Sequence, residues 1–249
     1  MDGINLKNIS HRYQHQLILS NIDLQIDKHK ITCLVGPNGS GKSTILKLLA
    51  GLLIPEHGSV TLDSIAISHY SQRALAKKLT YMPQQYRIPP SLKVREFVAL
   101  GRFCHQSWFA NLKEQDYFAI EQAMKMADVL QLADKIVTTL SSGEQQRVRI
   151  ALMLAQEAEY LLLDEPMTGL DIKQQRNLLE LLVTLQKKHG KTILIILHDL
   201  YQVIEIAEEV VLIKNGNIFG TGHPRSIINS DSLFKIFDCR FDLLPARSS

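Results

Sequence analysis

Cysteine is scarce in this sequence of 249 residues. The three cysteines, Cys33, Cys104 and Cys239, are odd in number and do not show the spacing of metal ligands. A disulfide framework like that of small secreted proteins is therefore excluded. Reduced thiols in a cytosolic protein are the simplest interpretation.

Long apolar runs are also missing. No stretch approaches the roughly 18 residues that a membrane-spanning helix needs, and Thr192–Leu197 has only the length of a strand. The first residues lack the charged segment and apolar block of a signal peptide. If the protein takes part in a membrane process, we expect another chain to cross the bilayer.

Charge of one sign is not in excess either. Lys and Arg together number 28 and Asp and Glu 25, so the net charge is +3, and the basic residues are spread along the chain. This distribution gives no electrostatic footprint for nucleic acid. With 45% hydrophobic residues, the chain can form a sizeable core as one globular unit with room for an inserted subdomain.

What the sequence does contain is a glycine-rich segment, residues 36–44, between a predicted buried strand at 31–35 and a predicted helix. It matches G-x-x-x-x-G-K-[ST], in which backbone N–H groups surround phosphate oxygens at the positive end of the helix. We expect Lys42 to reach the β- and γ-phosphates and the Ser43 hydroxyl to bind Mg²⁺. The candidate phosphate-binding residues are Gly36, Pro37, Asn38, Gly39, Ser40, Gly41, Lys42, Ser43 and Thr44.

Polar side chains follow other predicted strands. The apolar segment 160–163 leads into Asp164 and Glu165, and a bend at the end of that strand would give the two carboxylates different roles. Asp164 suits the Mg²⁺ shell, and Glu165 suits polarising an attacking water. Gln84 and His198 each follow another predicted strand, which brings them to the same crevice at the edge of a sheet.

Ser141 and Glu144 form a capping-box pattern, which predicts that a helix starts here and continues through 146–156. Two interpretations of this start remain open. It is either a well-capped helix and nothing more, or a second anion site in which serine hydroxyls and the helix dipole face a γ-phosphate.

The N-terminal region is predicted to be rich in strands. Partial alternation of apolar residues over 1–35 indicates strands, with Tyr13 either packed locally or stacked on an adenine. Residues 58–63 predict an edge strand, and 73–78 a basic helix. The C-terminal region predicts a hairpin over 210–220, with Asn215 and Gly216 in its turn and a short helical tail beyond it.

The region from about 90 to 156 has a helical pattern instead. Apolar residues recur at helical spacing over 94–101 and 117–130, and a loop is predicted over 102–112. Trp108 and Phe109 in that loop belong either to a local apolar cluster or to a contact with a partner.

In their order and spacing, these motifs resemble those of the nucleotide-binding subunit of an ABC transporter, over nearly the whole chain. Residues 36–44 match the Walker A motif, Gln84 the Q-loop glutamine, 140–145 the signature motif and 161–165 Walker B with the catalytic glutamate. The remaining matches are the D-loop at Gly169-Leu-Asp171, the switch histidine at His198 and the adenine-stacking aromatic at Tyr13.

The resemblance implies an α/β fold with a P-loop NTPase (RecA-like) core, an antiparallel β subdomain and an inserted helical subdomain. Residues 1–249 would then form a single ABC ATPase domain. Within it, 1–86 and 157–249 would make up the ATP-binding core with its β subdomain. Residues 87–156 would be the helical subdomain that carries the signature motif.

The resemblance also implies roles for individual residues. Glu165, His198 and Lys42 are expected to be catalytic, and the cofactors are expected to be ATP and Mg²⁺. Contacts to ATP within the chain are expected from Tyr13, residues 36–44, Gln84 and Asp164, with Ser43, Gln84 and Asp164 holding the metal. Contacts to the ATP of a second chain are expected from Ser141, Ser142, Gly143, Glu144 and Asp171.

The signature motif departs from the usual Leu-Ser-Gly-Gly-Gln in two places. Ser142 stands where the motif has its first glycine, and Glu144 stands where it has its final glutamine. A β-carbon at position 142 crowds the approach of a phosphate from a second chain, although serine hydroxyls would compensate if they bound it.

The partners expected from the resemblance are a second copy of the cassette, paired head to tail, and integral membrane permease subunits. A periplasmic or surface substrate-binding protein would take part indirectly, and no nucleic acid is expected. The location implied is the cytoplasmic face of the cell membrane, with the protein bound peripherally.

Residues 79–85 and 94–102 look like those of ATPases from ferric-siderophore, haem and cobalamin importers. A zinc- or manganese-importer cassette is the nearest alternative. A soluble ABC ATPase acting on nucleic acid or the ribosome, a P-loop kinase or GTPase, and half of an exporter remain as rivals. The balanced charge weighs against the first of these rivals, and the signature helix weighs against the second. The missing membrane helices weigh against the third.

Overall fold

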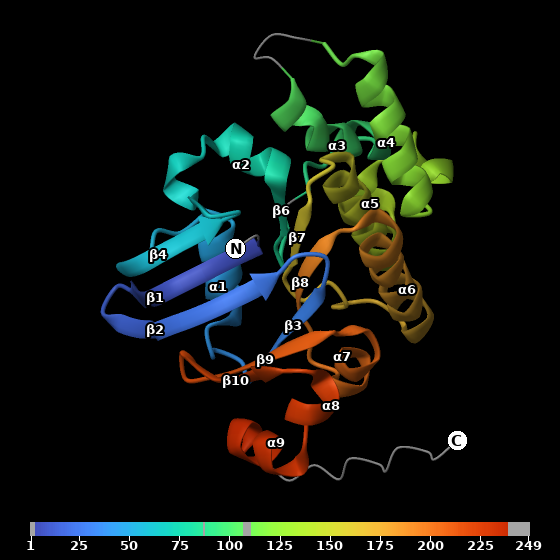
Figure 1. The fold of residues 1–249 in the computed structure, drawn as a ribbon. Helices are drawn as coiled ribbons and strands as arrows, with labels where there is room; N and C mark the ends of the chain where they lie inside the picture. Colours follow the sequence, from blue (N-terminus) through green and yellow to red (C-terminus); the bar gives the residue numbers. More distant parts are fainter. Residues whose placement is uncertain (1–2, 87, 107–110, 239–249) are drawn as a thin grey trace.

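The computed structural model describes residues 3–86, 88–106 and 111–238. Trp108 and Phe109, whose contact with a partner is an open prediction, lie outside the described residues, as does Cys239. The described chain folds into a mostly parallel sheet, an antiparallel sheet and helices that cover them (Figure 1). The expected α/β fold with an additional antiparallel sheet is therefore confirmed.

The larger sheet has six strands. In spatial order they are β10 (Asn217–Gly222), β9 (Glu209–Lys214), β3 (Ile31–Val35), β8 (Thr192–Ile196), β7 (Tyr160–Leu163) and β6 (Leu79–Met82). Neighbours from β9 to β6 run parallel, and β10 pairs antiparallel with β9. Every residue of β3, β7 and β8 is buried, as expected for parallel strands covered on both faces.

The smaller sheet is antiparallel. It consists, in spatial order, of β2 (Gln16–Asp27), β1 (Gly3–Tyr13), β4 (His57–Leu62) and β5 (Ile65–Ala66). The prediction that 58–63 is an edge strand was wrong, because the two-residue β5 pairs with β4 on its outer side. Asp63 and Ser64 make this possible by adopting φ of 49° and 66° in a tight turn, which the sequence pattern did not reveal.

Helix α1 (Lys42–Leu49) lies between the two sheets. Its Ile45 and Leu46 belong to the same buried cluster as Ile4 and Leu24 of the antiparallel sheet and Leu34 of β3. The glycine-rich segment therefore connects two packed elements, the strand β3 and the helix α1.

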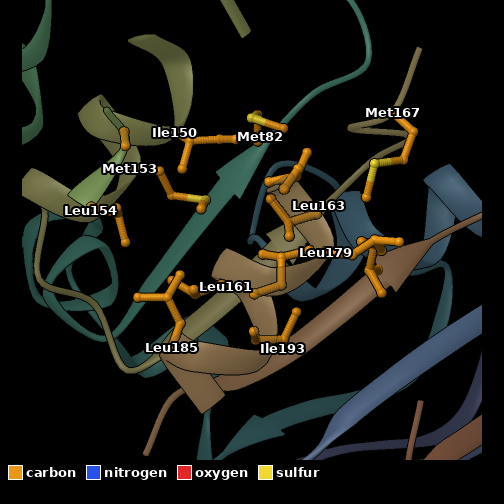
Figure 2. Packing of buried hydrophobic residues seen from close by; sticks show 14 of the residues in the cluster. Met82, Ile150, Met153, Leu154, Leu161, Leu163, Met167, Leu179, Leu185 and Ile193 are labelled. Carbon is orange, nitrogen blue, oxygen red and sulfur yellow. The ribbon is translucent and has the colours of Figure 1, made fainter. Parts of the chain in front are cut away.

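The other face of the parallel sheet packs on α5 (Ser142–Ala155) and α6 (Ile172–His189). Figure 2 shows Leu161 and Leu163 of β7 beside Met153 of α5 and Leu179 of α6. Tyr160 belongs instead to the cluster on the α1 side. Because alternate residues of a strand face opposite ways, one short strand supports both cores.

The described residues also form the remaining α-helices. They are α2 (Gln72–Lys78), α3 (Val94–Ala99), α4 (Glu114–Met126), α7 (Leu200–Ile206), α8 (Pro224–Ile227) and α9 (Ser230–Phe237). Helices α3, α4 and α5 group at one end of the molecule, away from α8 and α9 (Figure 1). This group lies within the predicted helical region 87–156. None of the helices in the described ranges is long and apolar enough to span a membrane.

Two details of the helical region differ from expectation. Residues Leu100–His105 form a 3₁₀ helix, although a loop was predicted from Arg102 onward. It is fixed by the buried Arg102, which donates to Asp116 of α4 at 2.9 Å and to the carbonyl of Ala155 at 2.8 Å. Helix α4 ends earlier than predicted, at Met126, since Asp128 adopts a φ of 54°.

Candidate nucleotide-binding site

The residues predicted to bind phosphate and Mg²⁺ or to act in hydrolysis come together at the carboxyl ends of β3, β6, β7 and β8. Parallel strands place these ends along one edge of the sheet, where ligands bind in open α/β folds. The glycine-rich segment connects β3 to α1 at this edge, and Asp164 and His198 lie just beyond the ends of their strands.

Two glycines of the glycine-rich segment, Gly36 and Gly41, are required because other atoms approach them closely. A β-carbon on Gly41, which has a φ of 104°, would lie 2.5 Å from a methyl group of Leu19. A β-carbon on Gly36 would lie 2.0 Å from the carbonyl oxygen of Ile213 in β9. As the N-cap residue of α1, Gly41 also contributes no side chain over the first N–H groups of that helix, which favours an anion there.

Lys42 is buried, although its side chain is charged. Its Nζ donates to the carbonyl oxygens of Gly36 and Pro37, each at 2.8 Å, so the ammonium group lies across the loop. Burial lowers the pKa of Lys42, while the charges of Glu165 and Asp164 oppose that shift. The side chain is in position to transfer its hydrogen bonds to phosphate oxygens.

Ser43 and Asp164 meet directly. The Ser43 hydroxyl donates to Oδ1 of Asp164 at 2.9 Å, and the Tyr81 hydroxyl donates to Oδ2 of the same carboxylate at 3.1 Å. A serine hydroxyl and a buried carboxylate supply the hard oxygen ligands that Mg²⁺ prefers. These residues therefore fit a magnesium ion.

Tyr81 was missed by the sequence analysis. It lies in β6, and burial raises the pKa of its hydroxyl, with the charge of Asp164 adding to the effect. The Tyr81 hydroxyl is therefore a neutral hydrogen-bond donor that orients the Asp164 carboxylate. The spacing of strand residues 79–82 gives no indication of this role, since it depends on the register between β6 and β7.

Glu165 is held on both of its carboxylate oxygens. His198 Nε2 lies 2.7 Å from Oε1, and the side-chain amide of Gln84 donates to Oε2 at 2.7 Å. Glu165 has a φ of 50°, a strained conformation for a residue other than glycine. Because β7 ends at Leu163, this turn lets adjacent carboxylates point to different places, as the sequence analysis required.

Beside these residues lies a cavity of about 640 Å³, within the range of ligand pockets. The predicted residues Gly36, Pro37, Ser40 and Asp164, all in the described part of the chain, are not part of its lining. Tyr13 lies at its rim with 42% of its surface exposed, and its ring meets that of His11 edge to face at 5.1 Å. Ile18, which the sequence analysis did not select, also lines the cavity. The predicted residues in the lining are Tyr13, Asn38, Gly39, Gly41, Lys42, Ser43, Thr44, Gln84, Glu165 and His198.

The residues predicted to contact a second chain lie elsewhere. Among the described residues, those that line the cavity do not include Ser141, Ser142, Gly143, Glu144 or Asp171. The predicted start of α5 is confirmed, since the Ser141 N–H donates to Glu144 Oε2 at 2.9 Å and the Glu144 N–H donates to Ser141 Oγ at 3.3 Å. Asp171 caps α6 by accepting from the Gln174 N–H at 2.7 Å.

A second feature missed from the sequence supports the phosphate loop from behind. The N–H of Gly216, in the turn between β9 and β10, donates to the Ser40 carbonyl at 3.1 Å. The Gly216 carbonyl accepts from Ser20 N–H of β2 at 2.9 Å. A β-carbon on Gly216 would lie 2.2 Å from the Ile18 carbonyl, so glycine is required there. The Asn-Gly signal predicted the hairpin but not this contact.

The site combines a glycine-rich loop, a buried lysine, a paired serine and aspartate, and a glutamate that is bonded on both oxygens. These are the groups expected of a P-loop nucleoside-triphosphate site that carries out hydrolysis. The match of residues 19–168 to the family model for ABC transporters extends this conclusion, and the chain belongs to that family. It is accordingly an ABC-type ATPase.

A curated relative supports the same assignment. The ferric enterobactin transport ATP-binding protein FepC of Escherichia coli (strain K12) is 38% identical over 228 residues, which cover 92% of this chain and 84% of FepC. The resemblance to siderophore-importer ATPases that the sequence analysis stated is confirmed by this relative.

Solved structures agree with the fold. A transporter assigned to the metal-chelate ABC type, in an inward-facing conformation, matches with a TM-score of 0.85 and 29% identity, over 96% of this chain and 90% of that chain. The dimeric structure of a bacterial ABC transporter cassette matches with a TM-score of 0.79 and 31% identity, over 89% of this chain and 99% of that chain. The P-loop core with antiparallel and helical parts is therefore that of an ABC cassette.

Proposed function

We propose that this chain is the ATP-hydrolysing subunit of an importer for a ferric siderophore, acting with a separate permease. The observation that carries the enzymatic part is the Glu165 carboxylate, bonded to Gln84 and His198 at the mouth of a P-loop cavity. The cargo class is supported by the ferric enterobactin relative and the metal-chelate transporter, not by a residue of this chain.

Within one chain, the proposed roles begin with phosphate binding. Residues 36–44 surround the phosphates with N–H groups, and Lys42 exchanges its bonds to Gly36 and Pro37 for bonds to the β- and γ-phosphates. Tyr13 stacks on the adenine at the rim. Ser43 and Asp164 hold Mg²⁺, with Gln84 as a further candidate ligand. When bound, this ion neutralises charge that develops on the phosphate oxygens.

Glu165 orients and polarises the attacking water. Gln84 and His198 fix its two oxygens, so the carboxylate does not have to reorganise when the reaction begins. Since Gln84 follows β6 and leads toward the helical region, a shift in that region would move a group bonded directly to Glu165. This bond is a physical route by which a partner of the helical region controls hydrolysis.

The complete site requires a second copy of the chain. In the proposed head-to-tail pair, Ser141, Ser142, Gly143, Glu144 and Asp171 of one copy face the ATP bound by the other. Their position outside the cavity of their own chain supports this arrangement, as does the dimeric cassette of similar fold. The first turn of α5 also supplies N–H groups and a helix dipole suited to a phosphate.

The remaining partners proposed are the permease subunits, reached from the cytoplasmic face of the membrane through the helical region 87–156. A periplasmic or surface substrate-binding protein would act indirectly, by delivering the chelate to the permease. No role with nucleic acid is proposed.

The experiment that tests the function is a pull-down of tagged protein from detergent-solubilised native membranes, combined with growth assays. We expect a many-spanning permease to co-purify and growth on a ferric siderophore to fail when Lys42→Ala replaces the wild type. Growth failure under zinc or manganese limitation instead would move the cargo to the alternative class. Recovery of ribosomes or DNA-bound proteins would overturn the transport role and leave the ATPase chemistry intact.

A further inference from the structure

The first turns of α5 and α6 are packed against each other more closely than their capping patterns alone require. A β-carbon on Gly143 would lie 2.2 Å from the side-chain nitrogen of Gln174. Gln174 cannot move away freely, because its Oε1 accepts from the Asp171 N–H at 3.2 Å while its own N–H donates to the Asp171 carboxylate. The two capping boxes are therefore in direct contact.

Ser142 adds a hydrogen bond to this contact. Its hydroxyl donates to the carbonyl oxygen of Gly169 at 3.1 Å. Gly169 has a φ of 80° and lies in the turn that leads from Glu165 to Asp171. Glycine, the usual residue at position 142 in this motif, has no side chain with which to make this bond.

One turn further along α5, Gln146 reaches the same segment. Its buried side-chain amide donates to the carbonyl oxygen of Pro166 at 2.6 Å. Positions 142 and 146 are four apart and so lie on one face of the helix. This face of α5 is thus bonded to the segment 166–169 at both ends, directly after the catalytic Glu165.

We propose that Ser142 is a positioning residue: its hydroxyl fastens the first turn of α5 to Gly169, so that the signature turn and the D-loop approach the partner's ATP as one rigid unit. This inference rests on the proposed head-to-tail pairing, in which both segments face the same nucleotide. Two segments that are already fixed relative to each other lose less conformational freedom on pairing. The serine at position 142, where the motif usually has glycine, therefore strengthens the association of the two chains. Its effect is not limited to crowding the phosphate.

The test compares Ser142→Ala, which removes the hydroxyl, with Ser142→Thr, which keeps it. Ser226→Ala, at an exposed serine in the first turn of α8, is the matched control. The first readout is amide hydrogen exchange over residues 168–171 in the nucleotide-free protein. The second is ATPase activity as a function of protein concentration, which reports on pairing.

For Ser142→Ala we expect exchange over 168–171 to be about 3- to 10-fold faster, the range set by the loss of one hydrogen bond. The protein concentration for half-maximal ATPase activity should rise by a similar factor of about 3 to 10. The effect should fall on this concentration more than on kcat at saturation. Ser142→Thr should stay within about 2-fold of the wild type in both readouts, as should the control.

Two results would overturn the proposal. Unchanged exchange in Ser142→Ala would mean that the hydroxyl does not hold the D-loop, even if activity fell because a contact to phosphate was lost. Faster exchange with an unchanged concentration dependence would mean that the bond is only local. A wild-type ATPase activity per molecule that does not depend on protein concentration down to nanomolar levels, with a monomer in solution, would instead contradict the paired site of the proposed function.

Discussion

The cavity and the first turns of α5 and α6 are two halves of one proposed catalytic site, and they are built differently. In the cavity, the functional side chains range from buried (Lys42 and Asp164) to exposed (Gln84 and His198). They are bonded within the site: Lys42 to loop carbonyls, Ser43 to Asp164, and Glu165 to Gln84 and His198. At the first turns, Ser141, Ser142 and Asp171 are exposed, and their bonds serve to cap and join helices.

The difference follows from what surrounds each half. The cavity lies at the carboxyl ends of parallel strands, so packing of the sheet fixes its geometry within one chain. The first turns begin two helices at the surface, and in the proposed pair the other chain supplies the nucleotide that they face. A change in the cavity should therefore affect nucleotide binding in any state of assembly, and the chemical step in the pair. A change at the first turns should affect only activity that depends on pairing.

The largest effect is expected from Glu165→Gln. Replacing the carboxylate that polarises the water should lower kcat by about 100-fold or more, the range of general base catalysis. ATP affinity should change little, since the amide keeps the size of the side chain. Turnover under saturating ATP and binding of a fluorescent ATP analogue measure the two parts separately. Glu180→Gln on the exposed face of α6 is the control. Turnover within a few-fold of the wild type would remove Glu165 from this role.

Lys42→Ala should act on binding instead. Loss of charge-assisted bonds to two phosphates should weaken nucleotide affinity by about 100-fold. Lys47→Ala, in the last turn of the same helix, is a matched control because it removes the same charge away from the loop. Titration of monomeric protein with a fluorescent ATP analogue measures the effect without any contribution from pairing. Equal affinity of wild type and Lys42→Ala would exclude the phosphate-cradle assignment.

The two halves also differ in how much of them the sequence predicted. The strand, glycine-rich loop and helix of the cavity follow from local patterns, so residues 36–44 and the strand-end carboxylates could be placed without coordinates. Tyr81 and Gly216 could not, because their contacts to Asp164 and Ser40 depend on the register of β6 against β7 and on the position of a distant hairpin. Local periodicity carries no information about either.

At the first turns, the sequence predicted the caps but not what the caps join. Ser141 with Glu144, and Asp171 as a cap, are signals within a few residues of the chain. The bond from Ser142 to Gly169 and the contact of Gly143 with Gln174 join residues that are 27 and 31 positions apart in the sequence. Both contacts depend on how α5 packs against α6. The capping patterns alone do not reveal this packing, and a sequence with the same caps need not have a serine at position 142.

Gly143→Ala tests this packing, with a smaller effect than the cavity variants. The added methyl group displaces the Gln174 amide and breaks its bond to the Asp171 N–H, so ATPase activity should fall about 5- to 10-fold. Nucleotide affinity of the monomer should remain within about 2-fold, because no hydrogen bond of the cavity is lost.

A double variant separates the cause of that loss. Gly143→Ala combined with Gln174→Ala should be no worse than Gln174→Ala alone, since the side chain that the methyl group displaces is already gone. Activity is compared at several protein concentrations. If the fold-losses in ATPase activity of the two single variants multiply in the double variant, the contact with Gln174 does not explain why glycine is needed at position 143.

Asp63→Asn should have the smallest functional effect, because Asp63 lies in neither half. Its carboxylate accepts from the Tyr160 hydroxyl at 2.6 Å and lies 2.9 Å from Lys28 Nζ and 3.4 Å from Lys78 Nζ. Burial alone would raise the pKa of Asp63, but the bonds from Tyr160 and the lysines outweigh it and lower the pKa to about 2. We expect ATPase activity within about 2-fold of the wild type and a loss of stability of about 1–2 kcal/mol at pH 7.

The pH dependence of that loss identifies its origin. Since the folded pKa lies below the unfolded value near 3.9, the stabilisation from Asp63 is present above about pH 4 and is lost as the pH falls toward 2. The difference in unfolding free energy between the two proteins, measured with denaturant from pH 7 to pH 3, should therefore shrink below about pH 4. Asp134→Asn at an exposed position is the control. A difference that stays constant with pH would assign the loss to changed hydrogen bonding rather than to the charge of Asp63.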